Sequence, residues 1–547
     1  MKLTNWAKVG LTSLVALTLL TACGGNSKKS STGKSEQVFT RMEGDVIGGM
    51  DSAAVTDSIS GQALVDTMDG LYRYNGAKLE PAVATKVVKP TNDGKTYTFD
   101  LRKNAKWSNG DPVQAQDFVY GWKRAVDPAT KSQYAYLFAG VKNADAIMKG
   151  SEKPENLGIT AVDAHTLKVD LDYAIPYMDG LLTNPVFFPQ NEKAVKKYGS
   201  EYGTAYNKVV YNGPFKLTKW TGTNLSWSEV KNKSYWNAKA VKLDRIDVQV
   251  VKEPSTALNL FQSGKLDDAI LSGESARQMK QDPSFKAQPQ ASTFYLELNQ
   301  KKVAAFRNKN IRLAMSKAIN RKEFVTQVLG NSSLVAHTAV PQNLAQMPDG
   351  TDFAKAATKG HDYPTTFDKK EAQKLWKQGL KELGITSLNV DFLTDDSENA
   401  KKSSEYFQSQ LESVLPGLKM KITSLPFKSR LTRSESGDFD ICITLWGADF
   451  PDPITYLDLF TTGNQSNNGK WSNADYDKLI QASKTTDVTD EKKRFNDLLQ
   501  AQNILTDEAG IIPVYQTAQA HLVNPNVKDV AYSPSNQYNF VHTYIAK

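Results

Sequence analysis

The stretch FDKKEAQKLWKQGLKELGITSLNVDFLT, Phe367–Thr394, decides the fold class because it joins a capped amphipathic helix to a strand. Asp368 and Glu371 have the spacing of a capping box, and an apolar stripe follows them as far as Gly384, a residue type that often ends a helix. Residues 387–394 then have the composition and pattern of a strand. The stretch therefore predicts a helix and a strand in immediate succession.

This pair belongs to a longer alternation of helices and strands. A second helix is predicted over residues 404–415, and further strands over residues 418–426 and 440–445. Such an order is typical of an α/β domain in which helices cover a sheet. The second half of the chain is therefore assigned to the α/β class.

The first half combines short alternating strands with one clear amphipathic helix. Phe118, Val119, Trp122 and Ala125 fall on one face of a helix predicted within residues 113–126. A length of 547 residues is typical of about three domains. The strands predicted in this half cover residues 96–101, 165–171 and 242–251.

The first 22 residues have the pattern of a secretion signal. Lys2 and Lys8 precede the apolar run Val9–Leu20, which is too short for a membrane span of roughly 20 residues. The sequence Leu-Thr-Ala-Cys that ends at Cys23 resembles a bacterial lipoprotein cleavage box. We therefore expect Cys23 to be the lipidated first residue of the mature chain.

Residues 23–36 are rich in Gly, Ser and Lys and are predicted to form a flexible tether, so the functional domain begins near Gln37. The mature chain then keeps one thiol, Cys442, and no internal disulfide is possible. Loss of residues 1–22 removes two lysines and no acid, which lowers the formal charge from +8 to +6. This mild, dispersed charge argues against a nucleic-acid partner.

The residues give little support to enzyme chemistry. No two of the five histidines have a metal-ligand spacing, and no nucleophile motif of the G-x-S-x-G type is present. Gly33-Lys34-Ser35 lacks the earlier glycine of a phosphate-binding loop. Paired carboxylates for glycoside hydrolysis are not excluded, because the chain has 59 acidic residues.

The stretch DICITLWGADFPDP, Asp440–Pro453, is the most informative candidate site. It reads as a buried strand that ends by presenting Trp446 and then Asp449 to a loop. The residues alone leave four roles open for Asp449: a general acid, a metal ligand, an anchor for a cationic ligand, or a cap. Asp452, between two prolines, is interpreted as turn structure.

A family resemblance narrows these roles. KWSNGDPVQAQDFVYGWKRAVDP, residues 106–128, is very similar to a signature of the extracellular solute-binding proteins of peptide ABC transporters, in their oligopeptide-binding branch. Further landmarks span the mature chain in the family's order. They are TMDGLYRY (67–74), YNGPFKL (211–217), SYWNA (234–238), YLELNQ (295–300), FRNKNIRLAMSKAINR (306–321), WGADFPDP (446–453) and IIPVYQ (511–516).

The resemblance implies a two-lobed α/β fold of the periplasmic-binding-protein type II class, with discontinuous lobes joined by a two-segment hinge. The ligand-facing subdomain of lobe 1 would comprise residues 37–70, 205–290 and 517–547. An extra subdomain of lobe 1 would comprise residues 71–204, and lobe 2 residues 291–516. The lobes would close around the ligand by hinge motion.

The resemblance also assigns site residues. Asp449 matches the residue that binds the peptide's ammonium group, and Trp446 matches the wall of a side-chain pocket. The backbone of the same segment, Thr444 to Gly447, would pair with the peptide. The full set of predicted peptide-binding residues is Asp449, Trp446, Gly447, Leu445, Thr444, Phe427, Tyr515, Tyr136, Tyr134 and Ser58.

One departure concerns the other end of the peptide. Family members that bind short peptides tightly carry an arginine shortly before the tryptophan, whereas this chain has Ile443 there. The family's cysteine pairing is also absent, since Cys442 has no partner. Longer peptides whose carboxyl end leaves the cleft are therefore favoured.

The function implied is that of a lipid-anchored receptor on the outer face of a bacterial, Gram-positive cell membrane. It would bind oligopeptides and deliver them to permease subunits served by separate ATPases. It would be a monomer and not an enzyme, with no cofactor, metal or nucleic acid. The alternatives are a peptide-pheromone receptor of the same fold, a receptor for a metal chelate or oligosaccharide, and a peptidase or glycosidase.

Overall fold

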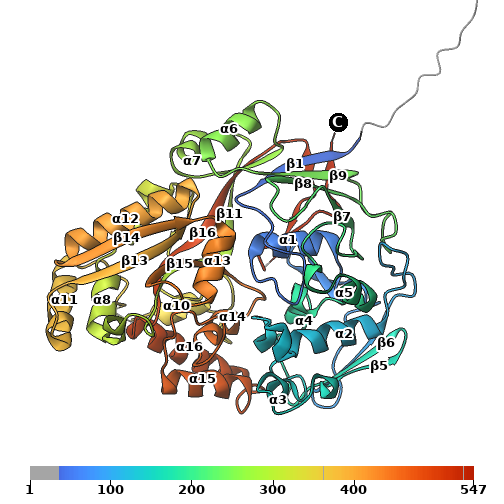
Figure 1. Ribbon diagram of the computed structural model, residues 1–547, viewed down its shortest axis with the longest axis horizontal. Coiled ribbons are helices and arrows are strands. Elements are labelled where there is room, and N and C mark those ends of the chain that lie inside the picture. Colours follow the sequence, from blue (N-terminus) through green and yellow to red (C-terminus); the bar gives the residue numbers. More distant parts are fainter. Residues whose placement is uncertain (1–35, 361–362, 534, 547) are drawn as a thin grey trace, which may run out of the picture. The chain divides into compact units, whose positions relative to one another are not determined.

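A computed structural model describes residues 36–360, 363–533 and 535–546 (Figure 1). The contacts within Gln37–Lys547 make it one compact unit. The predicted secretion signal, Cys23 and all but the last residue of the predicted tether lie outside the described residues. In the part that is described, none of the helices combines the length and the apolar character needed to cross a membrane.

One mixed sheet runs through the unit. Its strands follow the order β14, β13, β15, β11, β16, β10, β1, β9, β8, β7, and β12 pairs with β16 in addition. The strands are β1 (Val38–Glu43), β7 (Phe215–Thr218), β8 (Ser226–Lys231), β9 (Arg245–Val250), β10 (Asp268–Leu271), β11 (Phe285–Leu298), β12 (Leu334–Val335), β13 (Leu388–Asp395), β14 (Leu418–Leu425), β15 (Ile441–Gly447) and β16 (Ile512–Val523).

The helix and strand predicted from Phe367–Thr394 are confirmed as α11 (Lys369–Leu383) and β13. Asp368 caps the helix by accepting a hydrogen bond from the Glu371 N–H at 3.0 Å, and Gly384 ends it at φ +68°. β13 lies between β14 and β15 and is parallel to both, as the α/β prediction requires. The other helices of this half are α8 (Lys309–Lys317), α9 (Arg321–Glu323), η7 (Phe324–Leu329), α10 (Phe353–Thr358), α12 (Glu398–Val414), α13 (Phe427–Glu435), α14 (Ile454–Leu457), α15 (Ala474–Lys484) and α16 (Glu491–Asp507), with the short turns η6 (Ala304–Arg307) and η8 (Asp458–Phe460).

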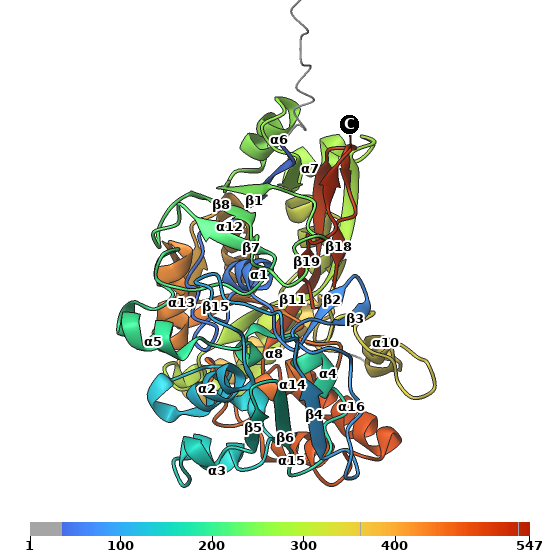
Figure 2. The same cartoon turned by 90° about the vertical axis from the view of Figure 1, so that its right-hand side faces the viewer.

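The amphipathic helix of the first half is confirmed as α2 (Ala115–Val126), and it packs beside a three-stranded sheet of β4, β6 and β5 (Figure 2). Trp122 is fully buried, and its ring meets those of Phe138 and Phe187 edge-on. The strands here are β2 (Tyr72–Asn75), β3 (Lys78–Pro81), β4 (Thr96–Asp100), β5 (Ile159–Asp163) and β6 (Thr166–Asp170). The helices are α1 (Ser58–Thr67), η1 (Pro128–Thr130), η2 (Ala135–Phe138), α3 (Ala144–Met148), η3 (Pro154–Asn156), α4 (Met178–Leu181), η4 (Pro185–Phe187), α5 (Glu192–Tyr198), η5 (Gly199–Glu201), α6 (Pro254–Gln262) and α7 (Gly273–Met279).

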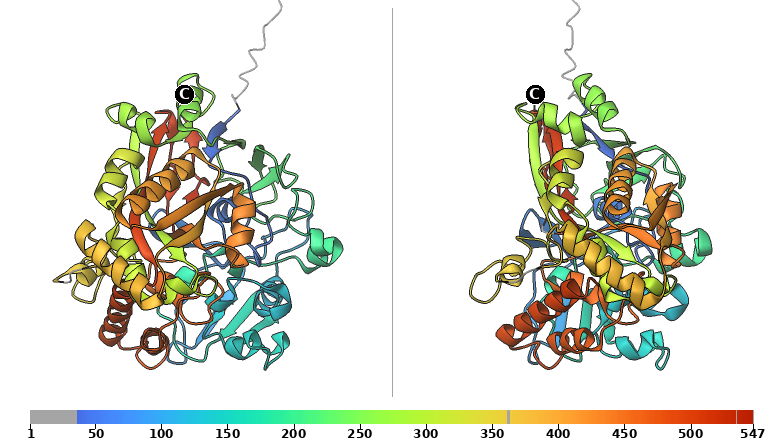
Figure 3. Two further views of the ribbon diagram at one scale, coloured as in Figure 1. Left: turned by 60° about the vertical axis from the view of Figure 1, so that its left-hand side comes forward. Right: turned by 90° about the vertical axis from the view of Figure 1, so that its left-hand side faces the viewer.

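The long strands β11 and β16 connect the two halves of the sheet (Figures 1 and 3). They are antiparallel from Phe285↔Leu522 to Leu296↔Ile512, but their register shifts between Pro289 and Thr293. The boundaries predicted between lobes, 290/291 and 516/517, fall at this irregularity. Such a break weakens the ladder locally and is a place where two strands could bend together.

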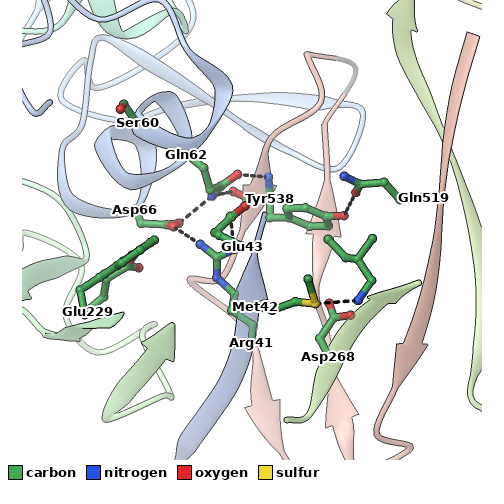
Figure 4. A network of polar contacts seen from close by, with 12 residues as sticks. Arg41, Met42, Glu43, Ser60, Gln62, Asp66, Glu229, Asp268, Gln519 and Tyr538 are labelled. Atoms are coloured by element: carbon green, nitrogen blue, oxygen red, sulfur yellow. Dashed lines mark hydrogen bonds and ion pairs between the residues drawn. The ribbon is translucent and has the colours of Figure 1, made fainter. Parts of the chain in front are cut away.

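A buried ionic network holds β1 against α1 and β8 (Figure 4). The Arg41 guanidinium lies 2.5 Å from the Glu43 carboxylate and 3.8 Å from that of Asp66. Gln62 donates to Asp66 at 3.0 Å and exchanges hydrogen bonds with the backbone of Tyr538 in β19 (Tyr538–Asn539). Burial and the nearby charge of Glu229 raise the pKa of Asp66 well above its usual range. The remaining short strands near the C-terminus are β17 (Val527–Lys528), β18 (Ala531–Tyr532) and β20 (Tyr544–Ile545).

Candidate functional site

β15 has one backbone edge that is only partly used. On one side it pairs with β11 along its whole length, from Ile441↔Leu298 to Gly447↔Ser292. On the other side β13 pairs only with Ile441 and Cys442. Among the described residues, no strand therefore covers the second edge of residues 443–447. An open strand edge can accept another extended chain by backbone hydrogen bonds.

The side chains of this edge alternate between two faces of the sheet. Thr444 and Trp446 lie opposite Tyr295 and Thr293, whereas Leu445 points to the other face and is 49% exposed. At Gly447 a β-carbon would come within 3.0 Å of Asn536 Nδ2. The backbone there is thus packed too closely for a side chain to be added without movement.

Asp449 lies two residues beyond the end of β15, where Thr455 accepts a hydrogen bond from its N–H at 3.0 Å. Its Oδ1 atom accepts hydrogen bonds from Tyr134 Oη at 2.8 Å and from Asn184 Nδ2 at 3.1 Å. Its Oδ2 atom is buried and has no hydrogen-bond partner in the described chain. A buried carboxylate oxygen without a partner is costly and leaves an acceptor for a ligand.

Burial raises the pKa of Asp449 to about 7, against the lowering effect of the hydrogen bonds from Tyr134 and Asn184. Within the described residues, no lysine or arginine forms an ion pair with this carboxylate. Asp452, three residues on, is different, because Arg494 binds it through two hydrogen bonds of 2.8 and 2.9 Å. Asp449 is therefore the acid of this loop that remains available to an external cation.

Aromatic rings surround the same carboxylate. The ring of Tyr134 meets that of Trp446 edge-on at 6.1 Å, and the Tyr136 ring lies 6.3 Å from that of Tyr134. Burial and the charge of Asp449 raise the pKa of both tyrosines well above the usual range. The indole Nε1 of Trp446 is buried without a hydrogen-bond partner, so the site holds an unused donor as well as an unused acceptor.

Five of the predicted residues lie together in the structure and are called the Asp449 cluster: Asp449, Trp446, Gly447, Tyr134 and Tyr136. Thr444 and Leu445 lie on the adjoining strand. Three other predicted residues form no hydrogen bond or ring contact with this group among the described residues. Phe427 is the half-buried first residue of α13, with the Arg430 guanidinium 5.3 Å from its ring centre. Tyr515 is buried in the core of the second half, stacked on Phe294 at 4.6 Å.

Ser58, the remaining predicted residue, is the exposed first residue of α1, and no hydrogen bond between described residues joins it to the Asp449 cluster. Asp57 precedes it and caps the helix through the Ser60 N–H at 2.8 Å. Ile443, at the place where a family arginine would be expected, is 6% exposed and belongs to the hydrophobic core. Its side chain therefore has no direct part in the site.

Sequence reasoning missed Asn184, which completes the environment of Asp449. Its Oδ1 accepts a hydrogen bond from the Val186 N–H at 3.0 Å, and this cap directs its Nδ2 toward the carboxylate. The pair is 265 residues apart in the chain. Only an asparagine before a proline marks the position in the sequence, and that pattern indicates a turn rather than a site.

Other polar features lie outside this cluster. An open trough of about 680 Å³ lies over β13 and β14, lined by both acidic and basic side chains, and it contains no residue of the Asp449 cluster. Across the described ranges, no three His, Cys, Asp or Glu side chains are grouped so that they could hold a metal ion. The Asp449 cluster is thus an aromatic, hydrogen-bonding site with one uncompensated carboxylate.

Comparison with known proteins gives consistent similarities over nearly the whole chain. The family model for bacterial extracellular solute-binding proteins, family 5 Middle, matches residues 78–468. The dipeptide-binding protein of Lactococcus lactis subsp. cremoris is 35% identical over 98% of this chain and 99% of its own. The structure of Listeria monocytogenes OppA bound to peptide is 40% identical, with a TM-score of 0.89, and covers 94% of this chain and 100% of that chain. The pheromone receptor PrgZ is 36% identical with a TM-score of 0.89, at the same coverages.

Proposed function

The chain belongs to the bacterial extracellular solute-binding proteins of family 5, and on this premise we propose that it captures oligopeptides beside Asp449 and delivers them to an ABC transporter. The family and the two-lobed α/β fold class predicted from the sequence are confirmed by the comparisons. Members of this family bind solutes, so this chain releases its ligand unchanged. The 40% identity with a peptide-bound oligopeptide-binding protein supports peptides as the ligand class.

The Asp449 carboxylate carries the proposal. It is buried, one oxygen lacks a partner, and no cation of the described chain compensates it. A peptide's terminal ammonium supplies both the missing positive charge and a hydrogen-bond donor. A charge-assisted hydrogen bond of this kind is roughly twice as strong as a neutral one. The carboxylate therefore selects for a free amino terminus without reading any side chain.

The open edge of β15 explains how the rest of the ligand is held. Residues 443–447 offer backbone groups that no neighbouring strand uses, and they lead directly to Asp449. A peptide that adds to this edge pairs through its own backbone, which is common to all sequences. Trp446 and Tyr134 then form one wall of a pocket for a peptide side chain. The affinity for a peptide thus comes mainly from the peptide's backbone and its terminal ammonium. The peptide's side chains add only modest selectivity.

Closure of the two lobes completes the site. Tyr134 and Asn184 belong to the predicted extra subdomain of lobe 1, whereas Asp449 belongs to predicted lobe 2. Their hydrogen bonds to one carboxylate bring the lobes together around the ligand position. Bending at the irregular part of β11 and β16 separates them again and opens the site.

The remaining assignments describe where the receptor works. A lipid on Cys23 anchors the chain to the outer face of the cell membrane of a Gram-positive bacterium, and the tether gives it reach. The monomer hands peptides to permease subunits, and separate ATPases supply the energy. The absence of an arginine at Ile443 favours peptides whose carboxyl end extends beyond the site.

A second candidate function is capture of a peptide pheromone. It is favoured by the 36% identity and TM-score of 0.89 with the pheromone receptor PrgZ. The two functions differ in selectivity, because a signalling receptor prefers one peptide whereas a nutritional receptor retains many. The experiment below distinguishes them by the diversity of the retained peptides.

The test uses the chain from Gln37 onward, which forms one compact unit. This chain is incubated with a mixed peptide digest, and retained peptides are identified by mass spectrometry. Retention of many unrelated sequences with free amino termini is expected. Retention of a single sequence would favour the pheromone receptor, and recovery of cleaved peptides would show an enzyme instead.

The anchor is tested by repeating the incubation with N-acetylated peptides and with Asp449→Asn. Loss of the buried charge pair is expected to weaken binding by roughly 2–5 kcal/mol. Asp475→Asn is the matched control, because Asp475 has a side chain that is 78% exposed and lies outside the Asp449 cluster. If acetylation and Asp449→Asn both leave retention unchanged, Asp449 is not the ammonium anchor.

A further inference from the structure

A hollow lined by positively charged side chains lies next to the C-terminal end of β11. It has a volume of about 420 Å³ and is lined by Gln300, Lys301, Arg307, Lys470 and Ser472. We propose that this hollow is a second binding site, specific for a phosphate group, either as free phosphate or as a phosphate ester. The peptide role proposed for Asp449 is not needed for this assignment.

The hollow is separate from the Asp449 cluster. The ladder between β11 and β15 runs from Ser292↔Gly447 to Leu298↔Ile441, and the hollow lies beyond the second of these pairs. Six residues of strand correspond to about 20 Å. A ligand in the hollow therefore does not touch Asp449 or Trp446.

The three cations of the hollow lie outside ion-pair distance of any described carboxylate, and the buried Glu297 acts on Lys470 only from farther away. Within the described residues, no ion pair is formed by Lys301, Arg307 or Lys470. The lining itself contains no acid. Three positive charges around one small space repel one another, and an anion between them removes that repulsion.

The neighbouring trough over β13 and β14 shows the opposite arrangement. There, Lys302 lies 3.2 Å from both Asp438 and Asp440. Lys419 of the same trough lies 3.2 Å from Glu412. Arg433 of the trough lies 3.1 Å from Asp438, so three of the trough's four cations are paired with acids of the protein, whereas those of the hollow form no ion pair among the described residues. This contrast favours the hollow over the trough as the place for an anion.

The protein holds two of the cations in place. Arg307 donates from Nε to the Gln300 carbonyl at 2.8 Å, which orients its guanidinium at the rim. Lys470 has φ +56°, a left-handed conformation that a lysine rarely adopts without structural cause. Burial lowers the pKa of Lys470, Glu297 opposes this effect, and the charge of Lys301 adds to it. Glu297 itself is buried and accepts a hydrogen bond from the Gly469 N–H at 2.8 Å.

Two uncharged polar side chains, those of Gln300 and Ser472, complete the lining of the hollow. Gln300 is 8% exposed, and its Nε2 has no hydrogen-bond partner in the described chain. A buried amide donor without a partner indicates a place where a ligand oxygen can be accommodated. The hydroxyls of Ser472 and Thr462 share a hydrogen bond of 2.7 Å in which either can donate, and when Thr462 donates the Ser472 O–H is free for a ligand oxygen.

The number and kind of donors favour phosphate over a carboxylate. A phosphate group has several acceptor oxygens and up to two charges, which match three cations, an amide and a hydroxyl. A carboxylate has only two oxygens and one charge, so it would leave some of the hydrogen-bond donors of the hollow without a partner. A nucleic acid requires an extended basic stripe, and the charge-paired trough beside the hollow does not continue one.

The test measures binding by the chain from Gln37 onward with isothermal titration calorimetry at constant ionic strength. The probes are inorganic phosphate, glycerol 3-phosphate and, as a control, chloride. The pocket variant is Lys301→Gln/Lys470→Gln. The matched control is Lys419→Gln/Lys421→Gln, which removes the same charge from the neighbouring trough. The wild type and the control are expected to bind phosphate with affinities within about twofold, and the pocket variant about tenfold or more weakly.

Vesicles of phosphatidylglycerol, compared with phosphatidylcholine, distinguish the source of the phosphate. Binding to the anionic vesicles that free phosphate displaces supports a lipid headgroup, whereas binding of the soluble phosphates alone supports a soluble source. Ser472→Asp, which places a negative charge in the wall, provides a second variant if the double substitution does not fold. The proposal is wrong if phosphate gives no more saturable heat than chloride, or if the control variant loses as much affinity as the pocket variant.

Discussion

Tyr134 donates its hydroxyl hydrogen to Asp449 over 2.8 Å, although 315 residues separate the two in the chain. The same carboxylate oxygen also accepts from Asn184, so two hydrogen bonds from the first half converge on one acid of the second. The other oxygen is left free. The carboxylate is therefore held in place by the protein while keeping an acceptor for a ligand.

Peptide affinity should depend on pH through Asp449. Burial raises its pKa to about 7 in the free protein, and a bound ammonium lowers it by favouring the charged form. Below pH 7 the carboxylate must lose a proton before it binds, so affinity falls by up to about tenfold for each pH unit until the pKa of the complex is reached. Calorimetric titration between pH 5 and pH 8 measures this slope. An N-acetylated peptide should show no such slope, and an equal slope for both peptides would contradict the assignment.

Lys252 should contribute to closure of the lobes. Its ammonium lies 3.0 Å from Asp45 and 2.5 Å from Asp396, which belong to predicted lobe 1 and predicted lobe 2. Lys252→Gln removes this link, and peptide affinity should weaken about two- to fivefold, as expected for a partly exposed ion pair. Lys265→Gln, at an exposed lysine that forms no ion pair among the described residues, is the control. Stopped-flow dissociation rates check the effect, and equal rates for both variants would show that the link does not favour closure.

Arg494 should be essential for stability rather than for binding. Its guanidinium forms a buried bidentate pair with Asp452, and Arg494→Met leaves that carboxylate buried without its cation. The expected loss is about 3–5 kcal/mol in the free energy of unfolding, measured by urea denaturation. Lys493→Met, next in sequence and 67% exposed, should cost less than about 1 kcal/mol. Similar losses for the two variants would contradict a special role for the buried pair.

Arg41 should stabilise the first half in a pH-dependent way. Arg41→Met leaves the carboxylates of Glu43, Asp66 and Glu229 without their cation, and the expected loss at pH 7 is about 3–5 kcal/mol. The folded-state pKa of Asp66 is already raised, so protonation on going to pH 5 favours the folded state and reduces the loss. Urea unfolding at both pH values measures the difference. A loss that grows at pH 5 would show that the sign of this linkage is wrong.

Cys442 should be unreactive in the folded protein. It is fully buried, and burial raises the pKa of its thiol to about 12, so almost no thiolate forms at neutral pH. In the chain from Gln37 onward, a chromogenic thiol reagent should react with Cys442 only after the protein is unfolded in concentrated urea. Rapid reaction without urea would mean that the core around β15 opens readily.

Local structure could be predicted from the sequence where neighbouring residues determine it. The cap at Asp368, the stop at Gly384 and the buried face of α2 depend on spacings within about one helix length, and all three are confirmed. Trp446 and Asp449 could be singled out because they stand together at the end of one strand. Their roles as peptide contacts came from a family resemblance and stay predictions.

The partners of these residues could not be predicted, because they come from distant parts of the chain. Nothing near Asn184 indicates a contact with Asp449, and nothing in the sequence of Tyr515 shows that its ring stacks on Phe294 in the core. The basic residues of the hollow are likewise separated, since Lys301 and Lys470 meet only after folding.

The sequence by itself therefore determined several of the helices and strands, the α/β class and the segment that carries the candidate site. Tertiary structure alone decided which edge of β15 stays open, which oxygen of Asp449 stays unpaired, and which cations of the described residues form no ion pair. The physical reason is the range of the interactions. Capping and amphipathic spacing act between near neighbours, whereas burial, desolvation and charge compensation depend on every group that folding brings within a few ångströms.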